Sequence, residues 1–408
     1  MIDLQINWRG IVHDASGYSR YARDQVLALD AEGVDVRLEP LNFGTPAAPL
    51  DPRQADRLRR LAEKPVASDK LRVLIVNMLP TVCNPLAERS RYDVVICLTM
   101  YEATRVPLHW MLVLNSYDAV IVCSKQCVAS FEASGVKVPV HLVPVGAPVD
   151  QFMPGTEKLR IPGAEAHFKF LSVFQWNHRK GPDILLRAFW SEFSARDKVA
   201  LIIKSCAGSS GRILDQLALR QQIVATKRQL GFSDDRAPVL LNSAVLPDSA
   251  MQLLYRAADV FVLPTRGEGA GLPFVESMCS GTPVIATGWG GQMDFLNRDN
   301  AWIIDYDLTS TTDSQASPIG PIFSGLLEEG MEWAECKLSA LQAAMRRAHD
   351  NPGELRAKGV NARASMEAMP WTRSAHALTN AVRGVCDQSA RSRVQPATQR
   401  GRAPSAAL

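Results

Sequence analysis

The sequence lacks any long apolar segment and any large excess of charge. No apolar run approaches the eighteen or so residues of a membrane-spanning helix, and the opening residues Met1–Arg9 are too few and too polar for a secretory signal. The formal net charge is only +3 over 408 residues, and no aromatic-basic RNA motif occurs. These absences favour a cytoplasmic protein that does not bind nucleic acid, with peripheral contact at the inner membrane face left open.

Signals for metal and redox chemistry are also scarce. The eight cysteines are scattered, mostly within apolar runs such as Val94–Leu98, and show neither zinc-ligand nor disulfide spacing. The acidic pair Asp234-Asp235 lies in a polar turn, where water is the commoner partner. No Gly-x-Gly-x-x-Gly fingerprint follows the first strand, which disfavours a dehydrogenase. The sequence therefore predicts no metal site and no bound cofactor.

Apolar runs of strand length alternate with segments of helical composition along the chain. This alternation is typical of α/β domains with parallel sheets, and 408 residues that are 47% hydrophobic suffice for two cores. A polar stretch with glycine and proline at 144–166 interrupts the pattern. We therefore predict two Rossmann-like domains, residues 1–155 and 156–370. The predicted strands are 4–7, 34–38, 72–76, 94–98, 119–122 and 140–143, then 168–173, 200–204, 238–241, 260–263, 283–286 and 302–305.

The most informative stretch is Pro264–Glu276, where a glycine-rich turn separates a strand from a helix that begins near Leu272. The unsatisfied N–H groups and positive dipole end of such a helix suit an anionic diphosphate. Gly267, Gly269 and Gly271 would let the backbone approach a ligand closely. The carboxylates of Glu268 and Glu276 can each accept hydrogen bonds from sugar hydroxyls. The stretch predicts a nucleotide-sugar site.

The run Glu268-Gly-Ala-Gly-Leu-Pro-Phe-Val-Glu276 resembles the Glu-x7-Glu motif of the retaining family 4 glycosyltransferases. The similarity continues at 254–259, 281–287 and Gly290-Gly291, with weaker similarity along most of the chain. It implies the GT-B architecture, in which two Rossmann-like domains face a central cleft and a C-terminal helix, here 371–386, crosses back to the first domain. It also implies transfer of a hexose from a nucleoside-diphosphate sugar, with retention of configuration, to a carbohydrate or glycolipid acceptor. Ala270 departs from the family pattern, because relatives often have an aromatic residue at this position. The smaller side chain is expected to enlarge or alter the sugar pocket.

Cationic residues for the departing diphosphate are expected at the start of the second domain. Lys180 is similar in position to the phosphate-binding lysine of the family's Arg-x-Lys-Gly loop, but the accompanying arginine is missing at its usual place, where this chain has Phe174 or Gln175. Arg179 or Lys204 is expected to replace it. The N-terminus of the helix that begins near Leu272 completes the neutralisation, and the predicted chemistry is metal-independent.

The first domain offers two further candidates. Gly17 follows the first strand and resembles the family's glycine loop that faces the donor phosphate, although a single glycine also suits an ordinary turn. Glu102 follows the fourth strand, at the sheet edge where α/β domains bind ligands. Relatives often have a histidine near this position, so we expect Glu102 to orient the acceptor. His109 is the alternative, although a histidine beside Trp110 is more often a packing residue.

Two segments fall outside the predicted site. Residues 308–318, rich in serine and threonine, read as an exposed insertion, and the basic tail 387–408 reads as disordered. Surface polysaccharide or glycoconjugate assembly is the setting that the resemblance suggests. A nucleotide-sugar 2-epimerase-like isomerase and a non-catalytic sugar-nucleotide binding protein remain alternatives. The residues do not specify the donor base, the sugar, the acceptor, the linkage or the oligomeric state.

Overall fold

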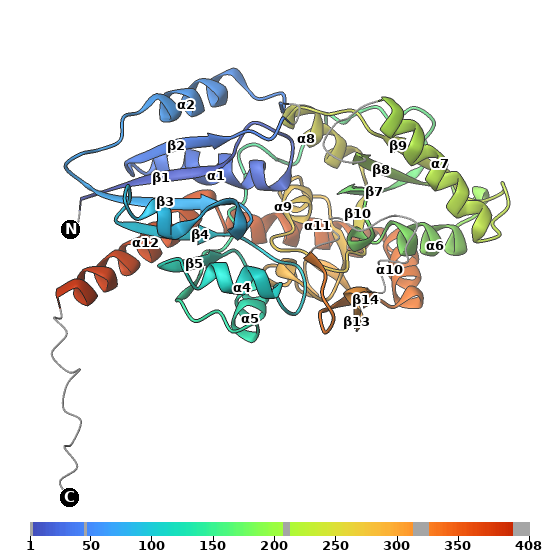
Figure 1. Cartoon of the computed structure of the whole chain (residues 1–408). Helices are drawn as coiled ribbons and strands as arrows, with labels where there is room; N and C mark the ends of the chain where they lie inside the picture. Colours follow the sequence, from blue (N-terminus) through green and yellow to red (C-terminus); the bar gives the residue numbers. More distant parts are fainter. Residues whose placement is uncertain (1–2, 45–46, 207–212, 313–325, 395–408) are drawn as a thin grey trace, which may run out of the picture.

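The two series of apolar runs form two separate parallel sheets (Figure 1). The computed structural model describes residues 3–44, 47–206, 213–312 and 326–394. All twelve predicted strands are present, with their ends shifted by no more than a few residues. The two Rossmann-like sheets confirm the predicted fold class, and they lie on either side of residue 155, which we keep as the proposed domain boundary.

The first sheet has the strand order β2-β1-β3-β4-β5-β6, and all of its pairs are parallel. Its interior strands β4 and β5 are buried at every position, as expected where helices cover both faces. The strands are β1 (Leu4–Ile11), β2 (Val36–Leu41), β3 (Leu71–Asn77), β4 (Val94–Leu98), β5 (Ala119–Val122) and β6 (Val140–Leu142). The accompanying helices are α1 (Gly17–Ala31), α2 (Pro52–Glu63), α3 (Pro85–Glu88), α4 (Leu108–Leu114) and α5 (Lys125–Ala133).

The second sheet has the order β12-β11-β10-β7-β8-β9 and is also wholly parallel. Its strands are β7 (Phe168–Gln175), β8 (Val199–Cys206), β9 (Val239–Asn242), β10 (Val260–Leu263), β11 (Val284–Thr287) and β12 (Ala301–Ile304). Its helices are α6 (Pro182–Glu192), α7 (Ile213–Gln229), α8 (Asp248–Ala257), α9 (Leu272–Cys279), α10 (Leu338–Asp350) and α11 (Pro352–Glu367). Short 3-10 turns η2 (His178–Lys180) and η4 (Gly291–Asp294) follow β7 and β11.

The terminal helix α12 (Trp371–Val394) crosses back and packs on α1, as predicted (Figure 1). The Ala147 amide donates to the Met369 carbonyl at 2.7 Å, and the ring of Trp371 meets that of Tyr21 edge-on at 5.7 Å. The helix runs further than the predicted 386, because Asp387–Val394 contains no glycine or proline to stop it. The remainder of the predicted tail, 395–408, lies outside the described residues.

The predicted insertion is partly structured. Its first residues belong to β13 (Tyr306–Ser310), which pairs antiparallel with β14 (Glu332–Cys336) in a small separate sheet that the sequence analysis missed. The Thr104 amide of the first domain donates to the Glu332 carbonyl at 2.9 Å, so this hairpin also bridges the two domains. Most of the predicted insertion, from 313 onward, lies outside the described residues. Among the helices of the described segments, none combines the length and apolar character that crossing a bilayer requires.

Docking of α12 sets a sharp steric requirement at Gly146. A Cβ atom built on Gly146 would lie 2.5 Å from the Trp371 Cα, so Gly146→Ala must displace the helix start. We expect this substitution to lower the free energy of unfolding by about 1–3 kcal/mol in urea denaturation followed by circular dichroism.

The matched control for that substitution is Gly384→Ala within α12. A Cβ there meets nothing within 4 Å, so alanine should be neutral or stabilise by up to about 1 kcal/mol. Equal effects of the two substitutions would contradict the tight docking of Gly146 on Trp371.

Candidate functional site

The carboxyl ends of strands from both sheets meet at the interface between the domains. Residues 99–107 follow β4 of the first sheet, and Pro264–Gly271 follow β10 of the second. The second of these loops is buried along its whole length. Parallel α/β sheets bind ligands at this edge, and predicted site residues from both domains, Glu102 and Glu268 among them, lie here.

The glycines of the β10 turn lie against the first domain. A Cβ on Gly267 would lie 2.2 Å from the Glu102 carbonyl oxygen, and one on Gly269 would lie 2.8 Å from the Met100 Cβ. The Cys123 thiol, at the end of β5, also lies 3.2 Å from the Gly269 carbonyl oxygen. The sequence assigned these glycines to close approach of a ligand; the structure shows that they also permit close approach of the other domain.

Two cations and two carboxylates form a buried cluster at this point. The Lys180 Nζ donates to Glu268 Oε1 at 2.5 Å, and Glu268 is only 5% exposed. Arg179 lies 3.3 Å from the Glu102 carboxylate and 4.0 Å from that of Glu268, and it donates to the Gly267 carbonyl. Thus Arg179, which we predicted to replace the missing arginine, reaches the predicted lysine and both predicted carboxylates. We call these four residues the interface cluster.

Burial and ion pairing act in opposite directions on Glu268. Burial raises the pKa of its carboxyl group, but the nearby Lys180 and Arg179 outweigh that effect and leave the pKa below its ordinary value. Glu268 is therefore ionised at neutral pH. The cluster holds two positive and two negative side chains, so every buried charge has a partner of the opposite sign.

Two helices begin at the cluster, each preceded by a glycine with positive φ. Gly181 has φ 69° and precedes α6 directly after Lys180, and a Cβ there would lie 2.2 Å from the Pro264 carbonyl oxygen. Gly271 has φ 77° and caps α9 just before Leu272. Only glycine suits both positions without strain. The two helix N-termini point their unsatisfied N–H groups toward the turn between them.

Glu276, on the first turns of α9, lies in a separate group of charges. It accepts a hydrogen bond from the Tyr255 hydroxyl at 2.8 Å and lies 3.8 Å from Arg20 of α1. Burial raises the pKa of Glu276 to about 7, with Arg20 and Tyr255 opposing the shift and Asp248 adding to it. The sequence analysis missed Arg20 and Tyr255. The available signal was the arginine itself, in a helix that also carries the apolar residues Val26 and Leu29, which are buried.

The other predicted residues, Gly17, Lys204 and Ala270, are not part of the interface cluster. Gly17 is the exposed first residue of α1; a Cβ there meets nothing within 4 Å, so no protein neighbour requires a glycine. Lys204, half-buried on β8, pairs in register with Val173 of β7, the strand that leads to the cluster. Ala270 is buried in the turn. The roles of these residues as donor contacts stay predictions.

Arg266, within the glycine-rich stretch, was not singled out from the sequence. It is 3% exposed and its guanidinium bridges Asp183 of α6, at 2.8 Å, and Glu335 of β14. It also donates to the His178 carbonyl. Arg266 therefore joins η2, α6 and the β13–β14 hairpin around the cluster.

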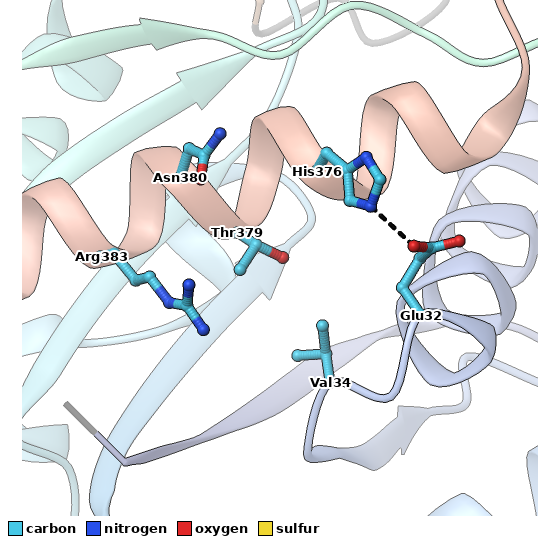
Figure 2. Close-up of a pocket in the computed structure, with 6 residues that line it drawn as sticks. All are labelled: Glu32, Val34, His376, Thr379, Asn380 and Arg383. Atoms are coloured by element: carbon cyan, nitrogen blue, oxygen red, sulfur yellow. Dashed lines mark hydrogen bonds and ion pairs between the residues drawn. The ribbon is translucent and has the colours of Figure 1, made fainter. Parts of the chain in front are cut away.

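A surface pocket of about 360 Å³ lies elsewhere, between α12 and the turn from α1 to β2 (Figure 2). It contains none of the predicted site residues. A contact of 2.6 Å between His376 Nε2 and Glu32 Oε2 crosses it, so the pocket lies where the terminal helix packs against the first domain. Its lining residues are Glu32, Val34, His376, Thr379, Asn380 and Arg383. Within the described segments, no group of three or more His, Cys, Asp or Glu side chains is arranged to hold a metal ion.

Comparison with known proteins agrees with this geometry. Residues 165–314 match the family model described as Glycosyl transferases group 1. The D-inositol 3-phosphate glycosyltransferase of Corynebacterium jeikeium (strain K411) is 35% identical over 160 residues, which is 37% of this chain and 36% of that protein. The chain thus aligns with about a third of the length of that curated relative.

Solved structures share the fold over nearly the whole chain. Sucrose-phosphate synthase from Thermosynechococcus elongatus has a TM-score of 0.66 at 18% identity, covering 94% of this chain and 100% of that one. Anabaena Alr3699/HepE in complex with UDP and glucose has a TM-score of 0.64 at 13% identity, covering 93% and 99%. The fold is therefore GT-B, and the segment 165–314, which matches the Glycosyl transferases group 1 model, holds Arg179, Lys180, Glu268 and Glu276.

Pairing within the interface cluster can be measured by a double-mutant cycle. Lys180→Met or Glu268→Gln alone leaves a buried charge or polar group without its partner, and each should lower the free energy of unfolding by about 3 kcal/mol. The double variant should cost clearly less than the sum, measured by urea denaturation.

The control cycle uses the exposed pair Arg59 and Glu63, 3.0 Å apart on α2, which should show no measurable coupling. Additive effects at Lys180 and Glu268 would mean that the two side chains do not form a buried pair in solution.

Proposed function

We propose that the two domains form a retaining glycosyltransferase, which moves a hexose from a nucleoside-diphosphate sugar to a hydroxyl acceptor. The observation that carries the proposal is the interface cluster, in which Lys180 and Arg179 lie between two helix N-termini. Few ligands other than a diphosphate would use two cations and two helix N-termini at once.

Each half of the donor has a proposed partner. Lys180, Arg179 and the N-termini of α6 and α9 bind the diphosphate, while Glu276 accepts hydrogen bonds from the ribose hydroxyls. Glu268 binds the hexose hydroxyls. Lys180 is paired with Glu268 in the structure. A bound diphosphate would take over Lys180 and release the Glu268 carboxylate for the sugar, so that the cations are placed before the donor arrives.

The transfer step follows from where charge develops. As the bond from the hexose anomeric carbon to the diphosphate oxygen breaks, negative charge grows on the leaving diphosphate, where Lys180, Arg179 and the helix N-termini stabilise it. The acceptor hydroxyl attacks from the face that the diphosphate leaves and gives its proton to a diphosphate oxygen. This route retains the anomeric configuration. Because protein groups meet the leaving charge, the mechanism has no step that requires a metal.

The first domain would supply the acceptor side. Glu102 lies 3.3 Å from Arg179 and so borders the proposed position of the leaving group; we assign it the role of orienting the acceptor hydroxyl. Gly267 and Gly269 touch Glu102 and Met100. Entry of a hexose between these loops therefore requires the two domains to separate and close again, as in other two-domain enzymes.

The names of similar proteins guide the choice of substrates for testing. A UDP and glucose complex of Alr3699/HepE puts UDP-glucose first among donors to try. The names D-inositol 3-phosphate glycosyltransferase and sucrose-phosphate synthase put polyol and sugar phosphates among the acceptors, beside glycan and glycolipid acceptors of surface polysaccharide assembly.

A thermal-shift panel of nucleoside diphosphates and their sugars tests donor binding. A ligand present at a hundred times its dissociation constant stabilises the folded protein by about 2.7 kcal/mol. We expect one nucleotide to raise the melting temperature of the wild type, because its ribose binds Glu276 and its diphosphate binds Lys180. We expect this shift to disappear in Glu276→Ala.

The matched control for the panel is Glu32→Ala, which alters a carboxylate in the surface pocket and should keep the shift. No shift with any nucleotide would contradict the proposal. Binding without transfer or hydrolysis would favour a non-catalytic binding protein, and an epimerised nucleotide sugar among the products would favour the isomerase.

Loss of the Lys180 charge should act on the chemical step. A charge-assisted hydrogen bond to the leaving group contributes about 1.5–3 kcal/mol, so Lys180→Met should lower kcat by roughly ten- to a hundredfold or more in a diphosphate-release assay. Glu102→Gln should instead raise the acceptor KM. A Lys180→Met rate within about threefold of wild type would remove Lys180 from the diphosphate site.

A further inference from the structure

Arg20 of the first domain forms a second contact between the domains, apart from the interface cluster. It is 8% exposed. Its Nη1 atom lies 2.5 Å from Asp248 Oδ1 of α8, and its Nη2 donates to Gln151 Oε1 at 2.9 Å. Its Nε donates to Asp24 of the same helix at 2.9 Å. Gln151 in turn donates to Asp248 at 2.6 Å. The Arg20 guanidinium is therefore fixed against the second domain by its hydrogen bond to Asp248, and Gln151 of the first domain, which binds both residues, supports that contact.

Several charged side chains surround Glu276, and the positive charge in contact with its carboxyl group is that of Arg20. From α1 the carboxyl faces Arg20 and Asp24, and from α8 it faces Asp248 and Tyr255. On the α11 side, Arg363 donates to the Cys279 carbonyl of α9 and pairs with Glu367 at 2.7 Å, so its charge is already matched. Burial is the main reason that Glu276 holds its proton more tightly than an ordinary glutamate; Asp248 and Asp24 add to this pKa shift, and Arg20 opposes it. Arg23 of α1 also interacts with Asp24 and Asp248, so these two carboxylates do not depend on Arg20 alone.

We propose that Arg20 is a positioning residue for the donor, in which the first domain keeps the ribose-binding carboxylate of the second domain ionised. This inference rests on the proposed function, because it assumes that Glu276 binds a ribose. An ionised carboxylate can accept hydrogen bonds from both vicinal hydroxyls, whereas a protonated one must use one oxygen as a donor. Arg20 acts through Glu276.

The arrangement couples nucleotide binding to domain closure. Arg20 reaches Glu276 only while α1 lies against α8 and α9. If the domains separate, Glu276 loses its nearest positive charge and keeps Asp248 on its own domain, which favours the protonated form. The ribose would therefore bind best when the domains are closed, which ties recognition of the nucleoside to assembly of the interface cluster.

The test compares ribonucleotide with deoxyribonucleotide binding across pH. UDP, GDP and ADP and their 2′-deoxy analogues are titrated calorimetrically against the full chain between about pH 5.5 and 8.5. The ratio of ribo to deoxy affinity reports the contact with the ribose 2′-hydroxyl. In the wild type this ratio should rise with pH, with a midpoint near 7, because Glu276 loses its proton there. In Glu276→Gln the ratio should be low and independent of pH.

Two variants that break the same contact should move the midpoint in opposite directions. Arg20→Gln removes the positive charge and should raise the midpoint by at least about one pH unit, which at pH 7 lowers the ionised fraction of Glu276 from about a half to about a tenth. Asp248→Asn removes a neighbouring negative charge and should lower the midpoint. Arg20→Lys keeps the charge and should keep the wild-type midpoint. General destabilisation of the interface would not produce opposite shifts.

The outcomes separate this inference from the proposed function. If wild type binds none of the six nucleotides, the proposed function itself fails. If it shows a ribose preference that Glu276→Gln abolishes, while Arg20→Gln and Asp248→Asn leave the midpoint unchanged or move it the same way, the proposed function stands and the role of Arg20 is overturned.

Discussion

The structure depends on paired charges buried where the carboxyl edges of two parallel sheets meet. At one end Lys180 and Arg179 pair with Glu268 and Glu102, and at the other Arg20 pairs with Asp248 near Glu276. A buried charge without a partner is costly, so the two pairs that cross between the domains, Arg179 with Glu102 and Arg20 with Asp248, fix how the loops of one domain sit on the other. The small residues at the contact follow from this closeness, since any side chain at Gly267 or Gly269 would collide with the opposite loop.

The same charges give the interface its proposed chemistry. Lys180 and Arg179 are held in place by carboxylates that a donor could replace with its diphosphate and its sugar hydroxyls, so binding would exchange one set of partners for another and would not bury new unpaired charge. Because protein partners occupy the cations in the closed arrangement, donor exchange and domain opening would be linked. The terminal helix α12, docked through Gly146 and Trp371 onto the first domain, is a further link between the two halves.

Much of the fold and part of the candidate site could be predicted, because short stretches of sequence specify strands and turns. Buried parallel strands appear in the sequence as apolar runs, and these runs located all twelve strands of the two parallel sheets. The turn between β10 and α9 could be predicted from Gly271 and from the glutamates on either side of it. Contacts between distant segments could not. Arg20 and Asp248 are far apart in sequence, and no local pattern around either residue indicates that they are in contact. The β13–β14 sheet was missed because Glu332–Cys336 mixes charged and apolar residues and does not form an apolar run. The end of α12 was placed too early because its last residues are polar, although they still form a helix.

The central claim is retention of configuration in a transfer from a nucleoside-diphosphate sugar, and proton NMR of the anomeric signal tests it most directly. The wild-type protein is incubated with the nucleotide sugar that binds best, with and without acceptor, and the first-formed sugar product is observed before it can mutarotate. The account predicts a product with the anomeric configuration of the donor, formed in step with free nucleoside diphosphate. A product of inverted configuration, or a changed sugar still attached to the diphosphate, would contradict it.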